Sequence, residues 1–137
     1  MPEVPGQLGE RTELDRSMHP PKIGHLHFIF DGWLGDELIT CFPCYLVTYD
    51  LQKKLENSGL TGFEISNDLE IEYSELFSDL YPGRTMPFFV RLLIKGIIGD
   101  DFFMNGQNHL MLSERAFDFL KTLGSIKHCR IDKTEHY

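Results

Sequence analysis

A chain of 137 residues with 42% hydrophobic content is long enough to form one domain around a single core. Its 21 acidic and 13 basic residues give a net charge of −8, which disfavours nucleic acid and anionic membranes and favours a basic partner. Moderate acidity also occurs because it aids solubility, so charge alone leaves both interpretations open. No apolar run reaches the roughly 18 residues that a membrane-spanning helix needs.

The first 21 residues mix proline, glycine and charges of both signs. We expect residues 1–21 to form a flexible tail before one α+β domain over residues 22–137. The tail lacks the basic start and apolar stretch of a secretory signal, which predicts a cytoplasmic protein. Three cysteines, an odd number, fit a reducing compartment without a disulfide framework.

Alternation of side chains predicts an inner strand from Lys22 to about residue 30, with His25 and His27 on one face and large apolar residues on the other. Residues 31–40 contain the glycines and acids of a turn followed by a short irregular or helical piece. The run CYLVT is a second strand, and a helix follows that Thr48 caps and Gly59 ends.

Further along, we expect a strand over residues 62–73, a short helix capped by Ser74 and a central strand within residues 86–96. A hairpin at Asn105-Gly106 precedes a second strand, capped helix, glycine and strand, in which Ser113 is the cap. The sequence therefore predicts a single α+β domain with a mostly antiparallel sheet of five to seven strands, two or three helices and two related strand-helix-strand modules.

The strand predicted over residues 63–73 is the strongest indication of function, because acids alternate there with apolar residues and continue into the next helix. The acids are Glu64, Asp68, Glu70, Glu72, Glu75 and Asp79. No Lys or Arg lies between Leu55 and Gly83. This pattern fits either a solvated or protected edge strand or a docking surface for a basic protein. A metal site is disfavoured because side chains in a row diverge.

Cysteines and histidines offer an alternative. Cys41 and Cys44 form a CxxC pair, and His128-Cys129 lies far away in the sequence. The pair precedes a strand instead of starting a helix, so buried, unreactive cysteines are favoured over a zinc or redox site. Other scattered acids and histidines, which the sequence does not bring together, are Asp31, Asp36, Glu37, Asp100, Asp101, His25, His27 and His109. We expect no catalytic residue, cofactor or metal.

The segments GLTGFEI, LYPG, DDFFMNG and HLMLSERAFDFLKTLG together resemble the pattern of small bacterial immunity proteins encoded beside polymorphic or contact-dependent toxins. The resemblance spans roughly residues 43–131. It implies a protein without catalytic residues that binds and neutralises a cognate toxin, often a basic nuclease. It transfers no active-site motif, so the six acids remain the expected partner-binding residues. The alternatives are a metal-dependent or redox enzyme built on Cys41, Cys44, Cys129 and nearby histidines, and an acidic adaptor.

Overall fold

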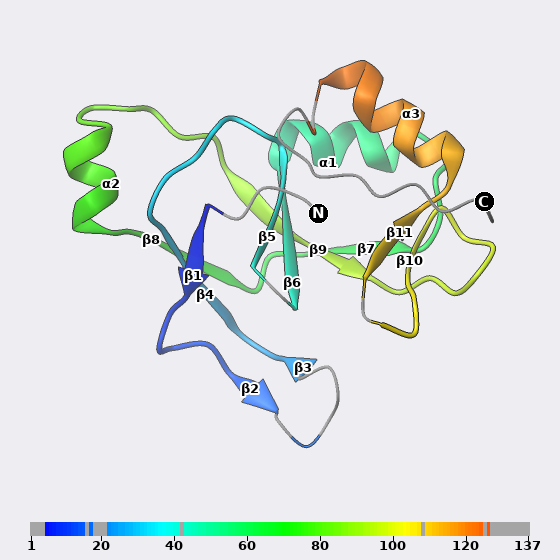
Figure 1. Ribbon diagram of the computed structural model, residues 1–137, viewed down its shortest axis with the longest axis horizontal. Coiled ribbons are helices and arrows are strands. Elements are labelled where there is room, and N and C mark those ends of the chain that lie inside the picture. Colours follow the sequence, from blue (N-terminus) through cyan, green and yellow to red (C-terminus); the bar gives the residue numbers. More distant parts are fainter. Residues whose placement is uncertain are drawn as a thin grey trace.

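The computed structural model describes residues 5–15, 17, 22–41, 43–107, 109–124 and 126. Within them the chain forms a mixed α+β fold with eleven strands in four sheets and three helices (Figure 1). The number of helices agrees with the sequence prediction. The number of strands is higher than the predicted five to seven, because several strands are only two or three residues long and leave little periodicity in the sequence.

The largest sheet has the order β5-β6-β9-β7, and every neighbouring pair in it is antiparallel. Its strands are β5 (Leu38–Cys41), β6 (Cys44–Thr48), β9 (Phe89–Ile94) and β7 (Phe63–Ser66). Strands β6 and β7 lie on either side of β9 and are both antiparallel to it, so they run parallel to each other. Helix α1 (Tyr49–Glu56) connects β6 to β7. The first predicted strand-helix-strand module is therefore confirmed, and β9 is the central strand that we expected.

Three smaller sheets complete the fold. The sheet β1 (Gly6–Leu8), β4 (Leu26–Phe30) and β8 (Leu69–Tyr73) has β4 at its centre, antiparallel to β1 and parallel to β8. The two-stranded sheets are β2 (Leu14–Asp15) with β3 (Lys22–Ile23), and β10 (Phe102–Met104) with β11 (Leu110–Leu112). Helix α3 (Glu114–Leu123) follows β11. The last strand of the second module, predicted at residues 127–131, lies outside the described residues.

The four-stranded sheet separates two hydrophobic clusters, because successive side chains of a strand point to opposite faces. On β6, Tyr45 and Val47 join a cluster with buried residues of α1 and α3, and Cys44 and Leu46 join a cluster with β4. The molecule therefore has three layers: α1 and α3, then the four-stranded sheet, then the sheet of β1, β4 and β8. Helix α2 (Glu75–Leu80) lies apart from the other two helices (Figure 1).

All three helices begin at the hydroxyl caps that the sequence predicts. The side-chain oxygens of Thr48, Ser74 and Ser113 each accept a hydrogen bond from the backbone amide three residues later, at 3.2, 3.2 and 3.0 Å. Helix α3 ends at Gly124, which has φ of 72°, as expected for a left-handed C-cap. Helix α1 ends earlier than predicted, with Asn57 as its C-cap.

The structure corrects the sequence prediction in several places. The strand predicted from Lys22 to about residue 30 is two strands, β3 and β4, which belong to different sheets. Strand β5 begins at Leu38, inside the segment expected to be a turn with an irregular or helical piece. Residues 5–15 do not form a flexible tail, because β1 pairs with β4, and β2 pairs with β3. The predicted strand over residues 63–73 is two strands: β7 ends at Ser66 and β8 begins at Leu69, and they belong to different sheets. The alternating pattern continues across the break, so periodicity alone gave no sign of it.

Candidate acidic binding site

Glu70 and Glu72 on one face of β8, together with Asp68 directly before the strand, form what we call the β8 acid row. Each of them contacts a basic or imidazole group from the N-terminal half of the chain. The guanidinium of Arg11 donates hydrogen bonds to Glu70 and, at 3.1 Å, to Oε1 of Glu72. Nδ1 of His25 lies 2.6 Å from Oδ1 of Asp68, and its Nε2 lies 3.3 Å from Oε1 of Glu70. The acid row is therefore partly neutralised within the chain.

His27 lies under this row and is 1% exposed. Its Nδ1 accepts a hydrogen bond from the backbone amide of Arg11 at 3.3 Å, and its Nε2 lies 3.1 Å from a guanidinium nitrogen of Arg11 and 3.2 Å from Oε1 of Glu72. A Cβ atom on Gly9 would lie 2.0 Å from Nδ1 of His27. The glycine thus allows the N-terminal segment to pass directly over the imidazole ring.

The contacts shift the pKa values of three members of the cluster. The hydrogen bonds from Arg11 first, and from His25 second, lower the pKa of Glu70 to about 2. Hydrogen bonds to Asp68 and then Glu70 raise the pKa of His25 above its ordinary value. The hydrogen bond to Glu70 likewise raises the pKa of Arg11. Glu70 is therefore an anion throughout the physiological pH range, so it cannot act as a general acid there.

The other three predicted site residues lie away from this contact network. Glu64 is on β7, in the four-stranded sheet, and is exposed. Glu75 and Asp79 are exposed on α2, which follows β8 directly. The structure therefore brings together Asp68, Glu70 and Glu72 and places two further acids on the next element, but Glu64 belongs to a different sheet. The break between β7 and β8 explains this difference from the prediction.

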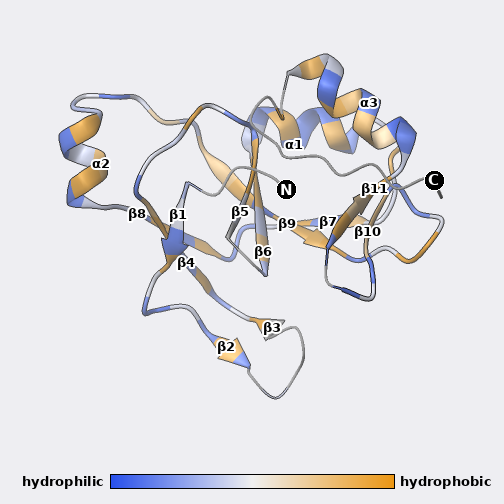
Figure 2. Cartoon of the chain, viewed as in Figure 1, coloured by the Kyte–Doolittle hydropathy of each residue, from blue (hydrophilic) through white to orange (hydrophobic). Residues whose placement is uncertain are grey.

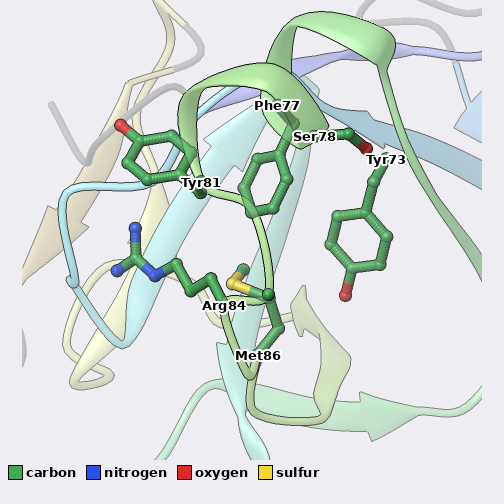
Figure 3. Close-up of a pocket in the computed structure, with 7 residues that line it drawn as sticks. Tyr73, Phe77, Ser78, Tyr81, Arg84 and Met86 are labelled. Atoms are coloured by element: carbon green, nitrogen blue, oxygen red, sulfur yellow. The ribbon is translucent and has the colours of Figure 1, made fainter.

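An open hollow lies beside the same strand and was not predicted. One part, of about 370 Å³, is lined by β8 from Asn67 to Tyr73 and by residues 86–89. A second part, of about 330 Å³, is lined mainly by Tyr73, Tyr81, Arg84 and Met86 (Figure 3). Tyr73 and Met86 line both parts, so we treat them as one feature, the β8 groove. Phe88 at its edge is 85% exposed, whereas the sequence around it is typical of a core strand.

The cysteine and histidine alternative gains no support from the described residues. Cys41 and Cys44 are opposite each other on the antiparallel strands β5 and β6, not at the start of a helix. Cys44 is 6% exposed in the hydrophobic cluster that contains β4, and residues 128 and 129 lie outside the described part. No group of three or more His, Cys, Asp or Glu residues within that part could hold a metal ion.

Two of the scattered acids, Asp100 and Asp101, have structural roles. Asp100 accepts a hydrogen bond from the backbone amide of Ile97 at 2.8 Å and belongs to the turn that the sequence predicts. Asp101 is buried and accepts hydrogen bonds from Thr61, Ser113 and Arg115. These contacts hold the pKa of Asp101 well below its usual range, mainly because Arg115 donates to the carboxylate. Asp101 therefore acts as a structural anion that joins the start of α3 to the loop after α1.

A comparison of the chain with protein-family models, curated proteins and solved structures found no match. Among the helices of the described residues, none is both long enough and apolar enough to span a bilayer. The features of this chain that bear on its function are the β8 acid row, the acids of α2 and the β8 groove.

Proposed function

We propose that this protein is a noncatalytic, cytoplasmic immunity protein that binds and neutralises a cognate bacterial toxin with a basic surface. The observation on which the proposal depends is the concentration of carboxylates on β8 and α2. One guanidinium, that of Arg11, contacts two of the three carboxylates of the β8 acid row, those of Glu70 and Glu72. The two acids of α2 are exposed, and the sequence has no Lys or Arg between residues 55 and 83. The excess negative charge favours a basic partner.

Electrostatic attraction of this kind acts mainly on the rate of association. A surface of one sign raises the encounter rate with an oppositely charged protein by one to three orders of magnitude at low ionic strength, and salt weakens the effect. Rapid capture suits an inhibitor that has to reach its toxin before the toxin reaches a substrate. The resemblance to immunity proteins supports the same role and requires no reactive group in the site.

The first experiment is to express the chain in its native host together with the flanking genes and to identify the proteins that co-purify with it. We expect a basic toxin domain at equal stoichiometry, and protection of cells that express the toxin. Recovery of an acidic or non-toxic partner would contradict the immunity proposal and favour an adaptor. Recovery of a stoichiometric metal or small molecule without a protein would favour the enzyme alternative.

The contribution of the acids is best tested on α2. The double variant E75K/D79K alters two exposed side chains for which the structure shows no ion pair among the described residues, so folding is expected to be preserved. It should lower the association rate with the toxin by roughly tenfold at low salt. The control E56K/D118K makes the same change in net charge on exposed positions of α1 and α3. Equal effects of the two variants would show that only overall charge matters.

A further inference from the structure

Along its outer edge, β8 pairs with no strand of the described residues. In the parallel ladder with β4, the amide of Leu26 donates to the carbonyl of Asp68, and the amide of Ser74 donates to the carbonyl of Phe30. In and next to β8, the amide and carbonyl groups of the even-numbered residues therefore point toward β4. Those of Ile71 and Tyr73 point away from β4, toward the outer edge. Within the described part of the chain, β4 is the only strand that pairs with β8. Such an edge is a template for another strand.

The β8 groove lies along this open edge. Leu69, Ile71 and Tyr73 line one side of it, and the segment from Met86 to Phe89 lines the other. Tyr73 is 40% exposed and Phe88 is 85% exposed, so aromatic surface remains in contact with water on both sides. The nearby helix α2 carries hydrophobic residues (Figure 2). Two of them are exposed, Leu76 at 55% and Leu80 at 58%. Exposed apolar surface beside an unpaired edge is typical of a protein-binding site.

The two faces of β8 specify what kind of strand can pair there. A strand added at the open edge would place alternate side chains beside Leu69, Ile71 and Tyr73 in the groove. The intervening side chains would lie on the opposite face, beside Glu70 and Glu72, whose side chains are 38% and 49% exposed. We propose that β8 binds an extended segment of the partner in which apolar residues alternate with Lys or Arg. This inference rests on the proposed function, since it names the part of the partner that is bound.

Charge favours such a partner over a second copy of this chain. Two β8 edges paired with each other would bring Glu70 and Glu72 of one copy close to the same acids of the other copy, and like charges opposite each other destabilise a sheet. A segment with Lys or Arg at alternate positions places opposite charges there instead. The basic residues can share the carboxylates that Arg11 and His27 already contact, because an ionised carboxylate accepts several hydrogen bonds.

The test uses a labelled, end-blocked peptide of roughly seven alternating valine and lysine residues, the length of an ordinary strand. We expect it to bind, with slowed hydrogen exchange at the amides of Ile71 and Tyr73. A peptide with glutamate in place of lysine should bind at least tenfold more weakly, and one with alternate N-methylated residues should not bind. Failure of the lysine peptide to bind, or equal binding of the N-methylated peptide, would overturn the inference.

Variants of the protein provide the second measurement. F88S should weaken binding of the lysine peptide by roughly tenfold, because exposed aromatic residues beside a groove are common sites of strong contact. I98S is the matched control, since Ile98 is also 85% exposed but does not line the groove, and it should change affinity by less than about twofold. Equal losses in the two variants would contradict the inference, as would a dimer of the wild-type chain that F88S converts to a monomer.

The peptide experiment and the toxin experiment can fail independently. If a toxin co-purifies and is inhibited, but F88S binds it as tightly as I98S does, the binding function stands and the β8 edge is not its site. If the lysine peptide protects Ile71 and Tyr73 but no toxin is found, the edge site stands and the immunity role is wrong.

Discussion

Replacement of Asp101 by Asn should destabilise the fold strongly although it changes the side chain very little in size. The Asp101 side chain is 8% exposed. Its carboxylate accepts hydrogen bonds from the amide of Thr61 at 2.9 Å, the hydroxyl of Ser113 at 2.6 Å and the guanidinium of Arg115 at 2.5 Å. An Asn side chain keeps one acceptor oxygen but turns an NH₂ group toward donors, so at least one buried donor loses its partner.

The expected loss follows from the number and kind of these bonds. Hydrogen bonds to a charged group contribute about 1.5–3 kcal/mol each, and a buried donor without a partner costs about 1–3 kcal/mol. Because the remaining oxygen retains some of the bonds, we expect D101N to lower the free energy of unfolding by about 3 kcal/mol. The control is D100N, since Asp100 accepts a single turn hydrogen bond from the amide of Ile97. That control should cost about 1 kcal/mol or less.

The effect should depend on pH in one direction. The pKa of Asp101 is lower in the folded protein than its ordinary value, because the ionised form receives the hydrogen bonds from Arg115 and Ser113. The ionised carboxylate therefore stabilises the fold fully at pH values above the unfolded pKa of about 4. That stabilisation is lost progressively as the pH falls through the range between the unfolded and the folded pKa. The difference between the wild type and D101N should thus shrink in acid.

Urea denaturation followed by circular dichroism measures both quantities. Wild type, D101N and D100N are unfolded at pH 7, pH 5 and pH 3, and the free energies are compared at each pH. If D101N costs no more than D100N at pH 7, the buried carboxylate does not stabilise the fold as described. If the difference between D101N and wild type stays constant down to pH 3, the ionised form of Asp101 is not the source of the stability.

Three further variants test other contacts. G9A should lower the free energy of unfolding by about 2 kcal/mol, because the added methyl group lies 2.0 Å from a ring atom of the buried His27. T48V should cost about 1–2 kcal/mol, since it removes the N-cap hydroxyl of α1; urea denaturation measures both losses. R11Q should raise the pKa of Glu70 from about 2 toward its ordinary value of 4.5, as observed in an NMR titration of the side-chain carboxyl carbon, because Arg11 donates the bonds that lower it.

Each of these variants has a control. G106A places a methyl group where no atom lies within 4 Å, so it should be nearly neutral. An equal cost of G9A and G106A would contradict the close approach to His27. S74A removes the cap of the short outer helix α2 and should cost less than T48V, because Thr48 also donates a hydrogen bond to Glu37 at 2.7 Å. An R84Q variant should leave the pKa of Glu70 unchanged, and a shift there would mean that long-range charge sets it.

Local features of the fold could be predicted from the sequence because they depend on neighbouring residues. The caps at Thr48, Ser74 and Ser113 are short-range hydrogen bonds, and the structure confirms all three. The strand that contains Phe28 was also predicted from its alternation, and it is the central strand of its sheet. A helix cap or an alternating strand can be recognised from residues a few positions apart, whichever element packs against it.

The arrangement of the candidate site could not be predicted in the same way. Arg11 and Glu70 are 59 positions apart in the sequence, and their ion pair exists because β1 and β8 flank the same central strand. Nothing in the sequence around Arg11 indicates that partner. Likewise, alternation continues from Glu64 to Glu72 although Asn67 and Asp68 separate two sheets. The sequence pattern therefore overestimated the number of acids that share one surface, since Glu64 lies on another sheet. It also gave no sign that Arg11 and His25 contact the carboxylates of the β8 acid row.

The contacts of His25 with the β8 acid row predict opposite effects of pH on folding and on binding. A rise in pH should lower the stability of the fold and speed association with a basic partner. Both ring nitrogens of His25 face carboxylates, those of Asp68 and Glu70, and its backbone amide lies 3.4 Å from Oε1 of Glu13. These neighbours favour the charged ring and raise the pKa of His25. Its stabilising contribution is therefore complete below the unfolded pKa of about 6.5 and is lost as the pH rises through the folded pKa.

Loss of that proton has the opposite effect on a basic partner. When His25 becomes neutral, Asp68 and Glu70 lose a neighbouring positive charge, and the surface near β8 becomes more negative. Association with the partner should then be faster above the pKa of His25 than below it, and stopped-flow measurements at low salt can follow the rate between pH 6 and pH 8.5. H25Q removes the titrating ring, so its association rate should change less over this range. A wild-type rate that falls as the pH rises would mean that the β8 acid row does not attract the partner.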